Sequence, residues 1–220
     1  MASETAVPTR VKICGLSTEA TLTAALEAGA DWIGLVHFAR SPRHVTLAQA
    51  AALSVLARGR AERVLLLVDP DDALVASAVA AADPDLIQLH GRESPERVAA
   101  IRAATGRPVM KALGIATPAD LAALPAYAAV ADRILLDAKA PADATLPGGN
   151  GRRFDWELLR GTDLPHGTML SGGLDAANVA EALMRTGLSA VDVSSGVESA
   201  PGTKDPSRIA AFVAAARAAR

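Results

Sequence analysis

Two side chains of the 220-residue chain have the chemistry of a general base and a general acid, Cys14 and Asp137. Cys14 ends the apolar run of VKICG, two residues after Lys12 and just before a helical stretch. That setting can favour a reactive thiolate. Asp137 ends the apolar run of RILLDAK, where loss of water would favour a protonated carboxyl group suited to donate a proton. Each also has a simpler interpretation, Cys14 as a small buried apolar residue and Asp137 as a partner of Lys139.

Two glycine-rich segments near the C-terminal end of the chain are typical of a phosphate site. SGGLDAANVAEAL contains Gly172 and Gly173, and DVSSGVES contains Ser195 and Gly196. Glycine lets backbone N–H groups approach an anion closely, and a following helix directs the positive end of its dipole at the anion. Either segment alone could close an ordinary turn. Together, in adjacent strand–helix units, they predict a phosphorylated ligand.

Two further segments could contact such a ligand. Arg43, in ARSPRHV, carries a planar guanidinium that suits bidentate binding of a carboxylate, although an arginine in a loop commonly faces solvent. Residues 140–153 form most of the long, glycine-rich stretch APADATLPGGNGRRFDW. This stretch is either a plain connection or a lid that closes over a substrate and excludes water.

The elements that must position these residues form a repeating pattern. Short apolar or β-branched runs alternate with Ala- and Leu-rich stretches of helical spacing, which is typical of parallel βα units. Ser17, Ser94, Thr117 and Asp205 are expected to cap four of the helices. Eight strands are predicted: Val11–Cys14, Trp32–Val36, Arg63–Val68, Leu86–Leu89, Pro108–Lys111, Arg133–Leu136, Thr168–Ser171 and Ala190–Val193.

Eight units in 220 residues predict a single (βα)8 (TIM) barrel domain over residues 1–220, with a doubly wound open sheet as the alternative. In a barrel the chemistry lies where the strands end. The polar residues expected at those ends are Cys14, His37, Asp69, His90, Lys111, Asp137, Ser171 with Gly172 and Gly173, and Ser194 with Ser195 and Gly196.

Composition narrows the class of ligand and partner. The net charge is -2, from 22 basic and 24 acidic residues spread along the chain, which gives no basic surface for nucleic acid or anionic membranes. The single cysteine allows no internal disulfide and no cysteine-based zinc site. No secretory leader and no apolar run of membrane-spanning length is visible. We therefore expect a cytoplasmic monomer that binds a small molecule.

The motifs VKICG, SPRHV, IQLHG, LLDAK followed by PGGNGRRFDW, LSGGLDAANV and VDVSSGVESAPGTKD occur in this order over nearly the whole chain. As a set, they closely resemble the phosphoribosylanthranilate isomerase family of tryptophan biosynthesis. The resemblance implies a (βα)8 barrel without metal or cofactor. The implied reaction is an Amadori rearrangement of N-(5-phosphoribosyl)anthranilate to 1-(2-carboxyphenylamino)-1-deoxyribulose 5-phosphate.

The resemblance also implies roles for individual residues. Cys14 aligns with the general base of the family and Asp137 with its general acid. The remaining matches are to substrate-binding positions: Arg43 for the anthranilate carboxylate, Gly172, Gly173, Ser195 and Gly196 for the phosphate, and His90 and Asp192 without an assigned contact. His37 stands where many members have an aromatic residue, so its role is open.

Two other functions are alternatives to this one. A tryptophan-synthase α-type barrel, which cleaves indole glycerol phosphate, relies on carboxylates and needs no cysteine on the first strand. A phosphate-ligand sensor without catalysis would need neither Cys14 nor Asp137. The presence of both residues favours the isomerase.

Overall fold

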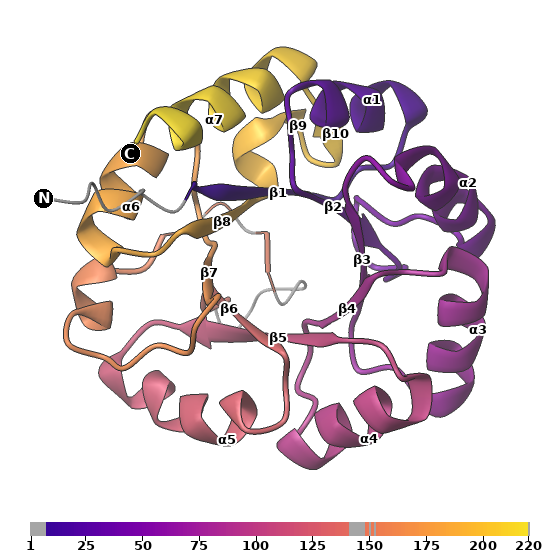
Figure 1. The fold of residues 1–220 in the computed structure, drawn as a ribbon, viewed down its shortest axis with the longest axis horizontal. Helices are drawn as coiled ribbons and strands as arrows, with labels where there is room; N and C mark the ends of the chain where they lie inside the picture. Colours follow the sequence, from indigo (N-terminus) through magenta and orange to yellow (C-terminus); the bar gives the residue numbers. More distant parts are fainter. Residues whose placement is uncertain (1–7, 141–147, 150, 152, 220) are drawn as a thin grey trace, which may run out of the picture.

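The computed structural model describes residues 8–140, 148–149, 151 and 153–219, and it shows a closed barrel of eight parallel strands (Figure 1). The predicted barrel is confirmed. Its strands are β1 (Arg10–Cys14), β2 (Trp32–Val36), β3 (Glu62–Leu67), β4 (Leu86–Leu89), β5 (Val109–Ile115), β6 (Arg133–Ala138), β7 (Met169–Leu170) and β8 (Ala190–Val193).

The pairing of β1 with β8 closes the barrel and excludes the open sheet. Val11 of β1 is in register with Val191 of β8, and Lys12 is in register with Asp192. On its other side β1 pairs with β2, where Cys14 is in register with Gly34. The first and last strands of the barrel are therefore neighbours.

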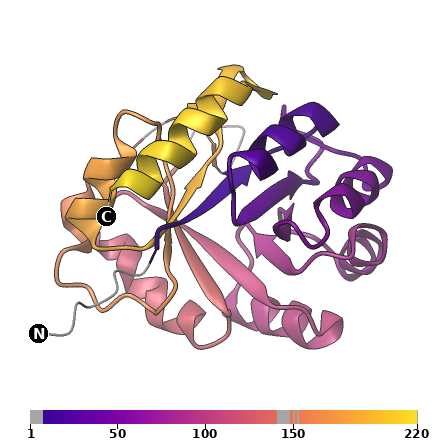
Figure 2. The same ribbon diagram turned by 45° about the horizontal axis from the view of Figure 1, so that its top comes forward.

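The helices form a ring around the barrel, as Figures 1 and 2 show. A two-stranded hairpin of β9 (Glu198–Ala200) and β10 (Thr203–Lys204) follows β8. The α-helices are α1 (Glu19–Glu27), α2 (Leu47–Ala57), α3 (Asp72–Ala82), α4 (Pro95–Thr105), α5 (Leu124–Ala128), α6 (Val179–Thr186) and α7 (Pro206–Ala218), and the 3₁₀ turns are η1 (Pro118–Ala123), η2 (Trp156–Leu159) and η3 (Ser195–Val197).

Two of the four predicted helix starts are confirmed, and the other two need correction. The Ser94 side chain accepts a hydrogen bond from the first turn of α4, and Asp205 does the same for α7. Thr117 precedes the 3₁₀ turn η1 rather than an α-helix. The prediction for the first helix was wrong by one residue, because the side chain of Thr18, not Ser17, accepts from the backbone of Thr21.

The prediction for the fifth strand also needs correction. β5 runs on to Ile115, so Lys111 lies in the middle of the strand and not at its end. Its ammonium group is buried in an ion pair with Glu93, at 2.7 Å, and donates to the carbonyl of Gly91 at 2.8 Å. Lys111 also lies over the ring of Tyr127 in α5. It therefore points toward the helix layer and fixes the loop after β4.

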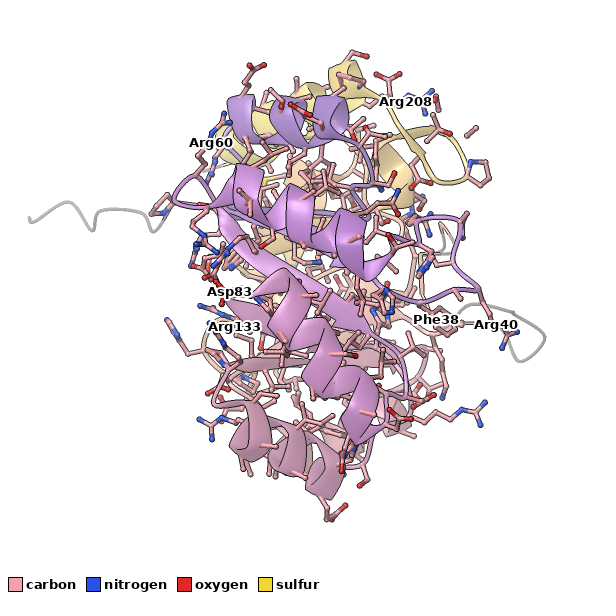
Figure 3. The ribbon with its side chains drawn as sticks, turned by 90° about the vertical axis from the view of Figure 1, so that its right-hand side faces the viewer. Phe38, Arg40, Arg60, Asp83, Arg133 and Arg208 are labelled. Atoms are coloured by element: carbon pink, nitrogen blue, oxygen red, sulfur yellow. The ribbon has the colours of Figure 1, made fainter. Side chains whose placement is uncertain are left out.

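A packed layer fills the N-terminal end of the barrel. Its largest member, the fully buried Trp32, donates from Nε1 to Glu62 at 2.7 Å and lies under the guanidinium of Arg10, 3.7 Å from the ring centroid. Arg133 lies over the same ring, at the opposite end of the barrel from Phe38 in Figure 3. The apolar members of the layer are Trp32, Val64, Leu86, Met110, Ala112, Leu135, Met169 and Ala190. With this end filled, the carboxyl ends of the strands are left to form a pocket.

Candidate active site

A pocket of about 740 Å³, including the part open to solvent, lies at the carboxyl ends of the strands. All the residues predicted for the site except Gly196 line it: Cys14, Arg43, His90, Asp137, Gly172, Gly173, Asp192 and Ser195. These residues come from strands and loops distributed around the whole barrel. In the described part of the chain, no three His, Cys, Asp or Glu side chains are placed to hold a metal ion.

Cys14 lies in the pocket wall with 4% of its surface exposed. Strand residues two apart point to the same side of a sheet, so Lys12 accompanies Cys14 inside the barrel, where its ammonium group lies beside the sulfur. Burial raises the pKa of the Cys14 thiol, and Asp192 adds to the rise, while Lys12 and Lys204 oppose it. The expected favouring of the thiolate is therefore not the net effect, because desolvation outweighs the two ammonium groups.

Asp137 faces the same pocket from β6, and its side chain is almost fully buried. Oδ1 accepts the backbone N–H of Ala138 at 2.8 Å, and Oδ2 lies 3.2 Å from Nε2 of His90. The simpler interpretation of Asp137 as a partner of Lys139 is excluded, since Lys139 pairs with Asp120 instead. The carboxyl group is left facing the pocket.

His90 links Asp137 to the interior of β4. The side-chain amide of Gln88, which is fully buried, lies 3.0 Å from Nδ1 of His90. With the amide N–H donating to Nδ1, the ring proton is on Nε2 and points at Asp137. Gly148 lies over this contact, because a Cβ added there would be 2.5 Å from His90 Nε2 and 2.6 Å from Asp137 Oδ2.

Arg43 is buried, which excludes the interpretation that it faces solvent. Its Nε and Nη2 donate to the two carboxylate oxygens of Glu198, at 2.6 and 2.9 Å. The bidentate geometry predicted for a ligand carboxylate is thus occupied by Glu198. Nη1 lies beside Gly149, where an added Cβ would be 2.6 Å away, so this nitrogen lies at the pocket wall.

A second cation stabilises this pair. Lys204, also buried, donates to Glu198 Oε1 at 2.8 Å and to the Ser194 carbonyl at 2.9 Å. Burial works against the charged form of Glu198, but Arg43 and Lys204 outweigh it and hold the pKa of the carboxyl below its usual range. One carboxylate and two cations leave this cluster with a net positive charge beside the pocket, which favours an anion there.

Gly172 and Gly173 form the turn after β7 with φ angles of +89° and +62°. A Cβ at Gly172 would lie 2.6 Å from the backbone nitrogen of Ala138, so a larger residue would push β6 away. The buried Asn178 holds the turn by donating to the carbonyl of Gly173 at 3.0 Å. The turn thus brings bare backbone against the pocket, as a phosphate site requires.

Ser195 and Gly196 have different positions from one another. Ser195 lines the pocket at the start of η3, whereas Gly196 is not part of the lining. A Cβ at Gly196 would lie 1.9 Å from the carbonyl oxygen of Leu174. Gly196 therefore allows the loops after β7 and β8 to pack against each other.

The wall beside Cys14 is apolar. Cys14 packs with Val36 and Leu66, and Phe38 and Val68 pack against them. His37 is not part of the lining: its Nδ1 donates to the Val45 carbonyl at 2.8 Å. The next residue, Phe38, lines the pocket.

The sequence-based predictions missed several groups that define this site. Glu198 and Lys204 flank the turn of VESAPGTKD, and two residues of opposite charge beside a Pro-Gly turn are a detectable hairpin signal.

The segment 140–153 was expected to be a plain connection or a lid. Its residues 141–147, 150 and 152 lie outside the described residues, so the structure does not decide between these two interpretations. Gly148, Gly149 and Gly151 do line the pocket.

The closed barrel, with its pocket at the carboxyl ends of the strands, defines the class as (βα)8-barrel enzymes. The model of the family "N-(5'phosphoribosyl)anthranilate (PRA) isomerase" matches residues 11–215. The chain belongs to this family.

Individual relatives agree over almost the full length. The N-(5'-phosphoribosyl)anthranilate isomerase of Azorhizobium caulinodans is 68% identical over 209 residues, which are 95% of this chain and 92% of the relative. The isomerase structure from Thermotoga maritima has a TM-score of 0.85 and 34% identity and covers 96% of this chain and 99% of its own. A phosphoribosyl anthranilate isomerase in complex with reduced 1-(o-carboxyphenylamino)-1-deoxyribulose 5-phosphate has a TM-score of 0.83 and 31% identity, with the same coverage.

The glycine turn after β7 gives a first test. We expect Gly172→Ala to abolish binding of inorganic phosphate in isothermal titration calorimetry, because the added Cβ meets the Ala138 nitrogen. Gly29→Ala is the matched control: Gly29 has a similar φ of +85°, but nothing lies within 4 Å of the added Cβ. Both variants bear the backbone strain, of roughly 1 kcal/mol, so equal phosphate binding by the two would contradict the assignment.

Proposed function

We propose that the chain catalyses the isomerisation of N-(5'-phosphoribosyl)anthranilate to 1-(2-carboxyphenylamino)-1-deoxyribulose 5-phosphate, an Amadori rearrangement. The observation that carries the proposal is that Cys14 and Asp137, from β1 and β6, line one pocket together with the glycine turn after β7. A base, an acid and an anion site around one cavity are what this reaction needs. A sensor would need only the anion site.

The shape of the pocket suits the three parts of the substrate. The phosphate binds at Gly172, Gly173 and Ser195, where backbone lines the pocket. The anthranilate carboxylate lies near Nη1 of Arg43, in the positive field of the cluster with Glu198 and Lys204. The aromatic ring packs on the apolar wall, and the ribose lies between, within reach of the acid and the base.

Asp137 is the general acid in this proposal. In its protonated form it donates to the ring oxygen of the furanose, the C1–O bond breaks, and a protonated Schiff base forms between C1 and the anthranilate nitrogen. The carboxylate that remains accepts the hydrogen bond from His90, 3.2 Å away. His90 thus positions the group and stabilises the charge that develops on it.

Cys14 is the general base. As a thiolate it removes the proton from C2, and the electron pair moves toward the iminium nitrogen to give the enolamine, which tautomerises to the ketone. The iminium is the electron sink, so the substrate itself supplies the chemistry that a bound cofactor supplies in other enzymes. Burial of the sulfur keeps water away from the intermediate.

We further propose that residues 1–220 form one domain that acts as a cytoplasmic monomer without metal or nucleic acid. The exposed large apolar side chains of the described residues are Val55 and Leu56 on α2 and Met184 on α6, which lie apart on the helix ring (Figure 1). They make no continuous apolar patch of the kind an obligate interface needs. A catalytic free thiol suits a reducing compartment. No described helix is long and apolar enough to cross a membrane.

Replacing the acid or the base tests the assignment. We expect Asp137→Asn and Cys14→Ser each to lower kcat by roughly 100- to 10,000-fold with little change in KM, because each removes a proton transfer made in the transition state. The measurement is the loss of substrate fluorescence with purified protein in a metal-free buffer. A kcat within a few fold of the unchanged enzyme would rule out the role of that residue.

The carboxylate site is tested through Arg43. We expect Arg43→Ala to raise KM by about tenfold or more, as the loss of a charged hydrogen bond implies, with a smaller effect on kcat. Arg40→Ala is the control, since Arg40 is an exposed arginine in the same loop and is not part of the pocket lining. Equal KM values for the two variants would show that Arg43 does not bind the substrate.

The oligomeric state is measured directly. We expect sedimentation velocity at micromolar concentrations to give a single species near the chain mass of 22.4 kDa. A species of twice this mass that persists on dilution would contradict the monomer.

A further inference from the structure

A fully buried lysine lies next to the sulfur of Cys14. The side chain of Lys12 has 0% exposure, and its ammonium nitrogen is 2.9 Å from Oδ1 of Asp192, which is 5% exposed. The same ammonium lies beside the Cys14 sulfur, since both atoms border the Cβ position of Gly34. One cation thus joins a carboxylate on β8 to a thiol on its own strand.

The neighbouring strand is adapted to this contact. Gly34 of β2 is in register with Cys14. A Cβ added to Gly34 would lie 2.9 Å from the Cys14 sulfur and 3.2 Å from the Lys12 nitrogen. Any larger residue at position 34 would displace one of these two atoms. The absence of a side chain there lets the thiol and the ammonium meet inside the barrel.

Burying the Lys12–Asp192 ion pair costs desolvation free energy. Removing an ammonium group and a carboxylate from water commonly costs more than their mutual attraction returns, and apolar residues of similar volume often stabilise a protein as well. The ion pair therefore needs a reason other than stability. Its position gives one, because Lys12 lies between Asp192, which keeps it charged, and the group proposed as the base.

We propose that Lys12 is a positioning residue for the base: its buried ammonium, held by Asp192, orients the sulfur of Cys14 and stabilises it as the thiolate that takes the C2 proton. This inference rests on the proposed function for the role of Cys14. The proton balance is simple. The thiol proton leaves to solvent through the open pocket, the thiolate forms next to the ammonium, and the proton from C2 then restores the thiol.

Other charged groups around the sulfur oppose or support this effect. Burial is the main cause of the raised pKa of Cys14, and Asp192 on β8 raises it further. Lys12 and Lys204 on β10 both lower it. Asp137, His90 and Arg43 line the same pocket from the other strands and loops. Of these groups, Lys12 exerts the largest charge effect on the thiol. Ser171 donates to Oδ2 of Asp192 at 3.1 Å and thereby fixes the carboxylate that pairs with Lys12.

The single cysteine of the chain makes a direct test possible. Alkylation by iodoacetamide and the ultraviolet absorbance of the thiolate, both followed against pH, report Cys14 alone. The variant is Lys12→Met with Asp192→Asn, which removes both charges and leaves neither unpaired. Loss of Lys12 raises the pKa of the thiol and loss of Asp192 lowers it, and the effect of Lys12 is the larger of the two. We therefore expect thiolate formation to move to higher pH by about half a unit or more, so that alkylation at a fixed pH below the thiol pKa slows about threefold or more.

Two further variants address misfolding of the double variant and a general effect of losing a buried ion pair. Lys12→Gln keeps a donor for Asp192 but removes the charge, and we expect the same direction of change if the double variant does not fold. Lys111→Met with Glu93→Gln is the matched control, because it removes the other buried lysine–carboxylate pair of a barrel strand, which has no contact with Cys14. We expect the thiol titration of this control to stay unchanged.

The outcomes separate this inference from the proposed function. An unchanged thiol titration in folded Lys12 variants would overturn the inference, but it would not contradict the proposed isomerase function. Full activity of Cys14→Ser would overturn the role of the base, whatever the titration shows. A titration that moves up equally in the Lys111 control would mean that any loss of a buried pair perturbs the thiol, and would also overturn the inference.

Discussion

The ion pair between Lys12 and Asp192 spans the line along which the barrel closes. Lys12 is in register with Asp192 across the β1–β8 pairing, and both side chains point inward. Without closure, each would be a buried charge without a partner, which is strongly destabilising. Closure thus pairs the two buried charges. It also brings the first strand, which carries Cys14, next to the loops after β7 and β8 that carry the proposed anion site.

The pocket divides into regions of opposite character. The apolar side of Cys14, Val36 and Leu66 lies above the packed layer around Trp32. The polar side contains Asp137 with His90 and the glycine turn after β7. Between them the Arg43–Glu198–Lys204 cluster provides a fixed positive charge. A ligand with a carboxylate-bearing aromatic ring at one end and a phosphate at the other matches this division in charge and polarity.

The hairpin after β8 carries two members of the Arg43–Glu198–Lys204 cluster and contacts the loop that carries the third. Glu198 and Lys204 belong to β9 and β10, and the turn between them contacts the loop of Arg43, where a Cβ on Gly202 would lie 2.4 Å from the Pro42 carbonyl. Lys204 in turn holds the carbonyl of Ser194, whose hydroxyl donates to the carbonyl of Cys14. Arg43 and the strand that carries Cys14 are therefore held by one short segment.

The sequence alone determined the number and order of the barrel strands and the (βα)8 class, because apolar periodicity is a local property. It placed most of the polar pocket residues close to the strand ends, although Asp137 lies within β6. It did not determine that Lys111 lies within β5 or that Arg43 pairs with Glu198, which is distant in sequence. It also did not show that burial outweighs Lys12 in setting the state of Cys14. Those facts depend on which groups lie within a few ångströms after closure, and on how much water is excluded. Both are decided only when all eight strands are in place.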